Sequence, residues 1–326
     1  MNGIQGTARL GFDPIKFRPV FRRQLLDTTI LTRITNNDFS GEFVGQGTTL
    51  EVPIEPLIKS RKRRQGDAVV YNRVNGLTEK FQIGRQAEIA FSLDREEIKF
   101  SAISNLPGQF MTFGTTQRLP GLEREFYGDI YAKAHPANQG NSAGLHGENF
   151  MLGEMLNPVV LWKTAADARA AGGAYNDVAA DYIVHLVNVL RKQPGAENIA
   201  PAVIVSVDVA DRIQTSELKQ ADLTGDDISL IRKDIRLIGN LGGANVYVTN
   251  LLPFFGQETG ANPQPFRSVC LALDNSAVTF WGDVGEIDMD MKDVNVRGSF
   301  NRAFFDYDWF VRYQERIATG ITAIGR

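Results

Sequence analysis

The segment GNSAG at residues 140–144 matches the pattern G-x-S-x-G, in which a serine on a strained turn serves as the nucleophile of a hydrolase. That chemistry needs a strand before Ser142, a helix after it, and a histidine base that is oriented by an acid. The residues before Ser142 read instead as the end of a helix followed by PANQ. The pattern therefore predicts a polar, glycine-bearing loop over 136–149, with a hydrolase that uses Ser142 kept as an alternative.

Three carboxylates alternate along one predicted strand, at Glu286, Asp288 and Asp290. Oxygen ligands of this kind can bind a hard cation. The same spacing is typical of the solvated face of a strand, and Lys292 is the next residue in the row. We expect no metal here.

Cysteine and histidine are scarce, with one cysteine and three histidines in 326 residues. A single cysteine excludes an intrachain disulfide and a two-thiolate metal site. Cys270 lies in the apolar run RSVCLAL, which predicts a buried and unreactive thiol. His185 falls within a predicted helix, and no phosphate-binding or dinucleotide-binding glycine motif is present. The sequence therefore predicts no enzyme activity, no catalytic residue and no cofactor.

Basic residues are concentrated in two places, although the chain as a whole has 35 basic and 38 acidic residues and a net charge of -3. The overall charge gives no reason to expect a surface that binds nucleic acid or membranes throughout. The run KSRKRR at 59–64 reads as a solvated loop tip, as a contact with acidic surface on a neighbouring subunit, or as a nucleic-acid contact. The first 40 residues read as a helix over 14–26 or as an extension that becomes ordered on a partner. The candidate intersubunit contacts are Lys59, Arg61, Lys62, Arg63, Arg64, Arg18, Arg22 and Arg23.

Short strands and amphipathic helices follow one another along the chain. Half-buried strands are predicted at 50–54 and 86–93 and form a long hairpin with the polar span between them. A capping box at Asp94 and Glu97 predicts the start of a helix, and a second helix is expected to begin near Pro120. The second helix has an apolar stripe at Leu122, Phe126, Ile130 and Ala134, and a third helix is predicted from 176 or 177 to 192. Further strands are predicted at 202–207, where Asp208 would cap a short helix, and at 245–250, 267–273 and 277–281.

The C-terminal region has the clearest period-two pattern. Apolar and acidic residues alternate over 286–292, and a change of phase at Asp293 predicts a bulge. Every odd position from 303 to 313 is apolar or aromatic, whereas charged residues occupy even positions. The pattern predicts an antiparallel ribbon with one buried face.

The order of these elements resembles that of tailed-bacteriophage major capsid proteins with the HK97 fold. The phrases that carry the resemblance are GQGTTLEVPI, FSLDREEI, PAVIVSVDVADRI, GGANVYVTNLLP, and the stretch from AVTFWGD to FVRYQER. The resemblance implies an α+β fold with an N-terminal arm, a long β-hairpin called the E-loop, a peripheral P-domain made of a spine helix and a β-ribbon, and an axial A-domain. On this chain it implies an arm at 1–41, an E-loop at 42–93, a first part of the P-domain at 94–199 with the spine helix at 119–134, an A-domain at 200–282, and a return ribbon with the C-terminal tail at 283–326.

The same resemblance implies a function and partners. It implies a structural subunit that assembles into pentamers and hexamers of an icosahedral shell around phage double-stranded DNA, which the shell contacts non-specifically. Separate scaffolding, decoration and portal proteins are implied as partners, and the location is the virion capsid after synthesis in the host cytoplasm. No signal peptide and no run of 18 apolar residues is visible, so no membrane association is expected. An encapsulin-like cellular shell shares the fold and stays open as an alternative.

Overall fold

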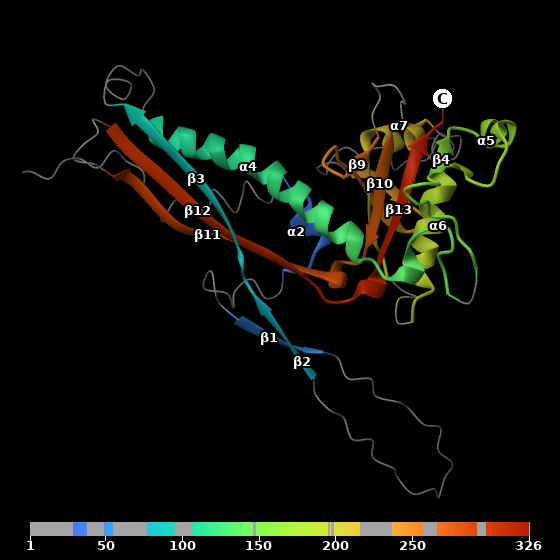
Figure 1. Cartoon of the computed structure of the whole chain (residues 1–326), viewed down its shortest axis with the longest axis horizontal. Coiled ribbons are helices and arrows are strands. Elements are labelled where there is room, and N and C mark those ends of the chain that lie inside the picture. Colours follow the sequence, from blue (N-terminus) through green and yellow to red (C-terminus); the bar gives the residue numbers. More distant parts are fainter. Residues whose placement is uncertain are drawn as a thin grey trace, which may run out of the picture.

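The described part of the molecule contains three sheets (Figure 1). An elongated three-stranded sheet and a long helix form what is called the arm below, which is distinct from the N-terminal arm expected at 1–41. A larger mixed sheet lies at one end of this arm, and a two-stranded sheet is separate from both. The computed structural model describes residues 29–37, 49–54, 77–94, 106–145, 148–194, 196, 199–215, 237–256, 266–291 and 298–325. The predicted helix at 14–26, Glu97 of the capping box, and the change of phase at Asp293 lie outside these ranges. Asp94 itself is the last residue of a strand.

The arm contains an antiparallel sheet in the order β11 (Val278–Met291), β12 (Gly298–Val311) and β3 (Arg85–Asp94). The predicted alternation in β12 is confirmed, because its odd residues from Ala303 to Trp309 are buried in the main core. The register between β11 and β12 shifts after Val284 and again after Asp288, as bulges do. A sheet with one buried face needs a cover on that face.

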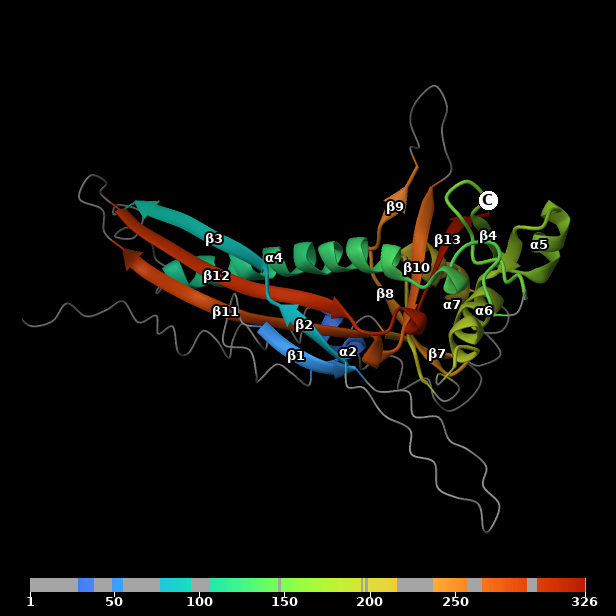
Figure 2. The same cartoon turned by 60° about the horizontal axis from the view of Figure 1, so that its bottom comes forward.

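That cover is the helix α4 (Leu106–Ile130), which runs along the arm sheet (Figure 2). Its 25 residues span about 37 Å. The expected spine helix at 119–134 was wrong at its start, because Pro120 lies inside α4 and does not begin it. The apolar stripe is confirmed, and burial of Met111, Leu119 and Leu122 on both sides of Pro120 offsets the hydrogen bond that the proline cannot make. Within the described ranges, no helix combines the length and hydropathy that spanning a bilayer requires.

A separate two-stranded sheet contains β1 (Thr49–Ile54) and β2 (Leu77–Gln82), paired antiparallel from Thr49 with Gln82 to Ile54 with Leu77. The long hairpin is thus present, but its second strand is β2 and not the predicted strand at 86–93. That segment belongs to β3, which pairs with β12 in the arm. The reason is burial, since Ala87 belongs to the core that contains the apolar side chains of α4, and Ile89 and Phe91 pack against that core.

The mixed sheet comprises eight strands, which come from residues 159 to 324. Its order is β5 (Asn176–Val178), β4 (Val159–Trp162), β13 (Ile317–Ile324), β10 (Arg267–Leu273), β6 (Ala202–Val205), β8 (Ala244–Val248) and β7 (Leu237–Leu241), with β9 (Phe254–Phe255) paired to β10. The expected boundaries at 199/200 and 282/283 do not follow this sheet, because β4 and β5 precede the first and β13 follows the second. The chain end joins the sheet because β13 is apolar and pairs on both sides, with β4 and β10.

Helices α6 (Ala179–Arg191) and α7 (Val207–Gln214) pack on one face of this sheet, beside the short surface helix α5 (Ala165–Ala171). The predicted apolar face of α6 is confirmed, including Ile183, Leu186 and Leu190. The cap of α7 is Ser206, whose hydroxyl accepts from the N–H of Val209, and not Asp208 as expected. Ser206 is the last residue with extended backbone, and that is where an N-cap must lie.

The opposite face of the mixed sheet shares one core with the arm. Leu271, Leu273 and Ile317 of the sheet pack with Phe126 and Ile130 of α4. A short helical turn, α2 (Leu31–Ile34), is buried in the same core. The arm is therefore anchored to the sheet through the C-terminal half of α4.

Candidate functional site

The hairpin leaves the arm at a joint of two residues. Strand β2 ends at Gln82 and β3 begins at Arg85, so Ile83 and Gly84 join the two sheets directly in the chain. Among the described residues, β1 and β2 pair only with each other. In the described part of the chain, the contacts that fix the direction of the hairpin relative to the arm are therefore side-chain contacts around this joint.

Apolar contacts hold one side of the joint. Phe81, Ile83 and Trp281 form a small cluster that is distinct from the main core, and Phe310 packs against it. Ile83 is 1% exposed, and the rings of Phe81 and Phe310 lie 5.4 Å apart between centroids. Burial of side chains of this size stabilises by about 1.5 to 3 kcal/mol each, so the cluster fastens the end of β2 to the ribbon.

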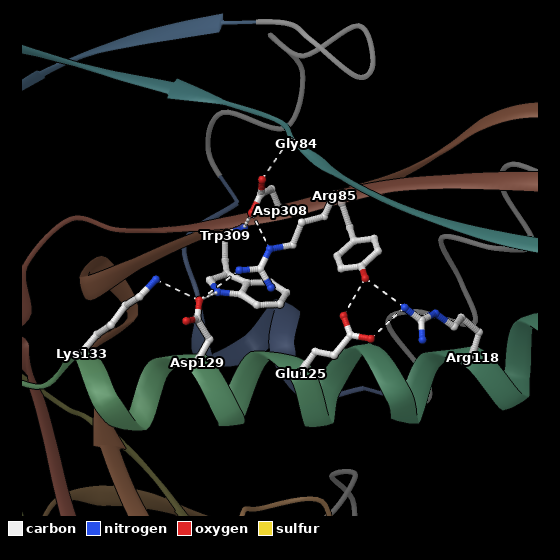
Figure 3. Close-up of polar contacts among 9 residues, drawn as sticks. Gly84, Arg85, Arg118, Glu125, Asp129, Lys133, Asp308 and Trp309 are labelled. Atoms are coloured by element: carbon white, nitrogen blue, oxygen red, sulfur yellow. Dashed lines mark hydrogen bonds and ion pairs between the residues drawn. The ribbon is translucent and has the colours of Figure 1, made fainter.

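Polar contacts with β12 hold the other side (Figure 3). The N–H of Gly84 donates to Oδ2 of Asp308 at 2.9 Å, and Nε2 of Gln86 donates to Oδ1 of Asp306 at 2.8 Å. Both aspartates are buried, at 5% exposed for Asp306 and 9% for Asp308. The sequence pattern implied that these even positions face solvent. This is wrong here, because the segment that contains Gly84 and Gln86 lies against both aspartates. Their burial is stable since each carboxylate accepts hydrogen bonds.

The predicted contact residues are not among those that the structure describes. Lys59, Arg61, Lys62, Arg63, Arg64, Arg18, Arg22 and Arg23 all lie outside the described residues. Sequence reasoning missed Gly84 of the joint and the two residues that hold it, Arg85 and Asp308. Each looks like an ordinary turn or surface residue in the sequence, so no local signal distinguished them.

The loop with Ser142 lacks the geometry of a nucleophile elbow. A short 3-10 turn, Pro136–Asn138, precedes the loop, and Ala143 pairs with Phe150 directly after Ser142. The side chain of Ser142 is exposed. Of the described histidines, His135 accepts from the backbone N–H of Ala137 and His185 contacts Asp177 at 3.1 Å. The chain positions neither as a base for Ser142.

The acidic strand and the cysteine also have structural roles. Asp288 forms an ion pair of 2.6 Å with Arg302 on the neighbouring strand. In the part of the chain that the structure describes, no three histidine, cysteine or acidic side chains gather as metal ligands do. Cys270 is fully buried, which raises the pKa of its thiol to about 12. The prediction of a buried thiol is confirmed, and the raised pKa favours the protonated form, whereas the thiolate is the reactive form.

Large apolar side chains are exposed in two places. Phe110 and Phe113 lie on α4 and are 43% and 58% exposed. In the segment before β4, Met155 and Leu156 are exposed, and Phe254 of β9 stacks on Phe266 with 5.2 Å between ring centroids. Exposed apolar groups of this kind mark surfaces that a protein covers on association.

Solved structures that are similar to this chain include chains from phages. A chain from Mycobacterium phage Che8 is 16% identical, with a TM-score of 0.56 over 92% of this chain and 91% of that one. The capsid of Ralstonia phage GP4 is 12% identical, with a TM-score of 0.56 over 92% and 90%. The capsid of cyanophage P-SCSP1u is 11% identical, with a TM-score of 0.55 over 87% and 85%.

No protein-family model matches the sequence, and no curated protein is significantly similar to it. The evidence for the fold is therefore the three-dimensional arrangement of the chain. The arrangement of this chain agrees with those phage chains over 85% to 91% of their lengths. The chain has the α+β fold of phage major capsid proteins, the HK97 type.

Proposed function

We propose that this chain is the structural subunit of a phage capsid, that its copies form pentamers and hexamers, and that these close into an icosahedral shell around double-stranded DNA. The observation that carries the proposal is agreement of the fold over 92% of the chain with a phage capsid subunit. The proposed role is structural and not enzymatic, and the proposed location is the virion after synthesis in the host cytoplasm.

The hairpin suits assembly for a physical reason. A two-stranded ribbon is marginally stable in water by itself, and β1 and β2 have no further strand beside them in the described residues. A neighbouring subunit can supply the missing contacts, and heterologous contacts between unlike patches close into rings when the rotation allows. Many such contacts, each weak, add up to a stable shell.

The basic residues are proposed as the charged part of these contacts. Lys59, Arg61, Lys62, Arg63 and Arg64 belong to the span between β1 and β2, which would reach a neighbour. Arg18, Arg22 and Arg23 belong to the proposed N-terminal arm, which would contact a neighbour or the packaged DNA without sequence specificity. Scaffolding, decoration and portal proteins are proposed as separate partners.

Electron microscopy of the purified full chain tests the proposal. We expect closed particles of megadalton mass, and deletion of residues 57–66 should leave a folded subunit that forms none. A matched variant keeps the length of the hairpin and replaces residues 59–64 by serine and glycine. Comparison of the two variants distinguishes the effect of the positive charge from the effect of the hairpin's length. Normal shells from the deletion would refute the hairpin's role, and a monomer or dimer at every concentration would refute the shell.

The content of the particles and an activity assay address the alternatives. DNA inside particles isolated from a phage lysate supports the phage capsid, whereas protein cargo without DNA supports the encapsulin-like shell. Ester or amide hydrolysis that is lost in Ser142→Ala would support the hydrolase.

A further inference from the structure

Arg85 contacts the two layers of the arm at once. Its Nη2 lies 3.2 Å from Oδ2 of Asp129 on α4, and its Nε lies 3.4 Å from Oδ1 of Asp308 on β12. Its guanidinium stacks on Trp309, with 3.8 Å from Cζ to the ring centroid. Figure 3 shows the guanidinium between the two carboxylates. A planar group with five donors can bridge in this way, which a lysine ammonium cannot reproduce.

Two further hydrogen bonds fix the carboxylate of Asp129 in the direction of Arg85. Its Oδ2 also accepts hydrogen bonds from Nε1 of Trp309 at 2.6 Å and from Nζ of Lys133 at 2.9 Å. Burial raises the pKa of Asp129, but the hydrogen bonds from Lys133 and Trp309 and the charges of Lys133 and Arg85 outweigh burial and lower it below its usual value. The carboxylate therefore stays charged at neutral pH and fixed in direction.

The helix is fastened to β12 at a second point as well. Tyr307 donates to Oε2 of Glu125 at 2.7 Å, and Nη2 of Arg118 donates to the Tyr307 hydroxyl and to Oε1 of Glu125, each at 2.9 Å. These contacts join α4 to β12 without touching the hairpin. Arg85 differs from them because it is the first residue after the joint.

We propose that Arg85 is a positioning residue that holds the start of β3, directly after the joint, to α4 through Asp129, so that the orientation of the hairpin follows that of the helix before any neighbour binds. The inference rests on the proposed function for its purpose, since a hairpin oriented in advance loses less conformational entropy when a neighbour captures it. It does not depend on shell formation for its test.

A distance measurement on unassembled subunits tests the tie. Spin labels at Thr49→Cys on β1 and Gln117→Cys on α4 are both at exposed positions, and buried Cys270 takes no label. Double electron–electron resonance on the dilute full chain should give a narrow distance distribution. We expect Arg85→Ala and Asp129→Asn to broaden or displace it, and Arg85→Lys to fall between them and the parent.

A matched control is the ion pair between Lys80 and Glu51, which lies within the hairpin at 2.9 Å. Lys80→Ala should leave the distribution unchanged. If Arg85→Ala does not fold, as judged by circular dichroism, Asp129→Asn and Arg85→Lys carry the test. An unchanged distribution in the folded variants would overturn the tie, whatever the assembly state. If the distance distribution broadens in the variants but the parent chain never forms shells, the first result supports the tie and the second refutes the capsid.

Discussion

Tyr182 of α6 lies directly over the backbone of Gly320 in β13, and its hydroxyl donates a hydrogen bond of 2.8 Å to the carbonyl of Leu152. A Cβ at position 320 would overlap both the Tyr182 hydroxyl and that carbonyl. The absence of a side chain at Gly320 therefore allows α6 and the loop at residue 152 to approach the middle of the mixed sheet.

Gly320→Ala should destabilise the chain by about 3 kcal/mol or more, because the buried groups around it have nowhere to move. Urea denaturation measures the change. The matched control is Gly128→Ala on α4, where a Cβ would meet nothing within 4 Å. That variant should be neutral or more stable by up to about 1 kcal/mol, since alanine favours the helix. Equal effects from the two variants would contradict this account.

Tyr307→Phe should lower the free energy of unfolding by about 1 to 2 kcal/mol, because Glu125 and Arg118 lose a buried hydrogen-bonding partner. Thermal and chemical denaturation check the value. Tyr131→Phe is the control, at a tyrosine whose hydroxyl has no hydrogen-bond partner among the described residues. A Tyr307→Phe variant as stable as its parent would show that the link between β12 and α4 adds nothing.

Cys270 should not react with a thiol reagent at pH 8 in the folded chain, since burial raises its pKa to about 12. It should react at once in denaturant, with one thiol released per chain. A colorimetric thiol assay gives both rates. Rapid reaction of the native chain would place Cys270 at the surface and would also invalidate the labelling scheme for the hairpin.

The pair of His185 and Asp177 should make stability depend on pH. The hydrogen bond that His185 donates to Asp177 raises the pKa of His185 above 6.5, burial opposes this shift, and the charges of Asp177 and Asp181 add to it. A histidine whose pKa is higher in the folded chain than in the unfolded chain adds to the free energy of unfolding. That contribution is complete below pH 6.5 and is lost as the pH rises through the pKa of the folded chain. Asp177→Asn should therefore lower the melting temperature more at pH 5.5 than at pH 8.5. An equal loss at the two values would reject the ion pair.

Local patterns in the sequence were sufficient for the elements whose periodicity comes from one buried face. The alternation in β12 and the apolar stripe of α6 each predicted burial correctly, because residues two or about 3.6 positions apart share a face whatever covers it. The order of such elements was also enough to suggest the capsid fold that the whole chain has.

Only the tertiary structure decided which strands pair and which side chains meet. Strand β3 pairs with β12 and not with the hairpin. Strand β13, the last strand in the sequence, lies between β4 and β10 in the mixed sheet. Arg85 meets Asp129 across 44 residues of sequence, and Gly84 meets Asp308 across 224. Such contacts carry no local signal, since they exist only when α4 and the ribbon have already packed. The sequence by itself determined the kinds of element and their order, whereas long-range packing determined the joint at which the hairpin is held.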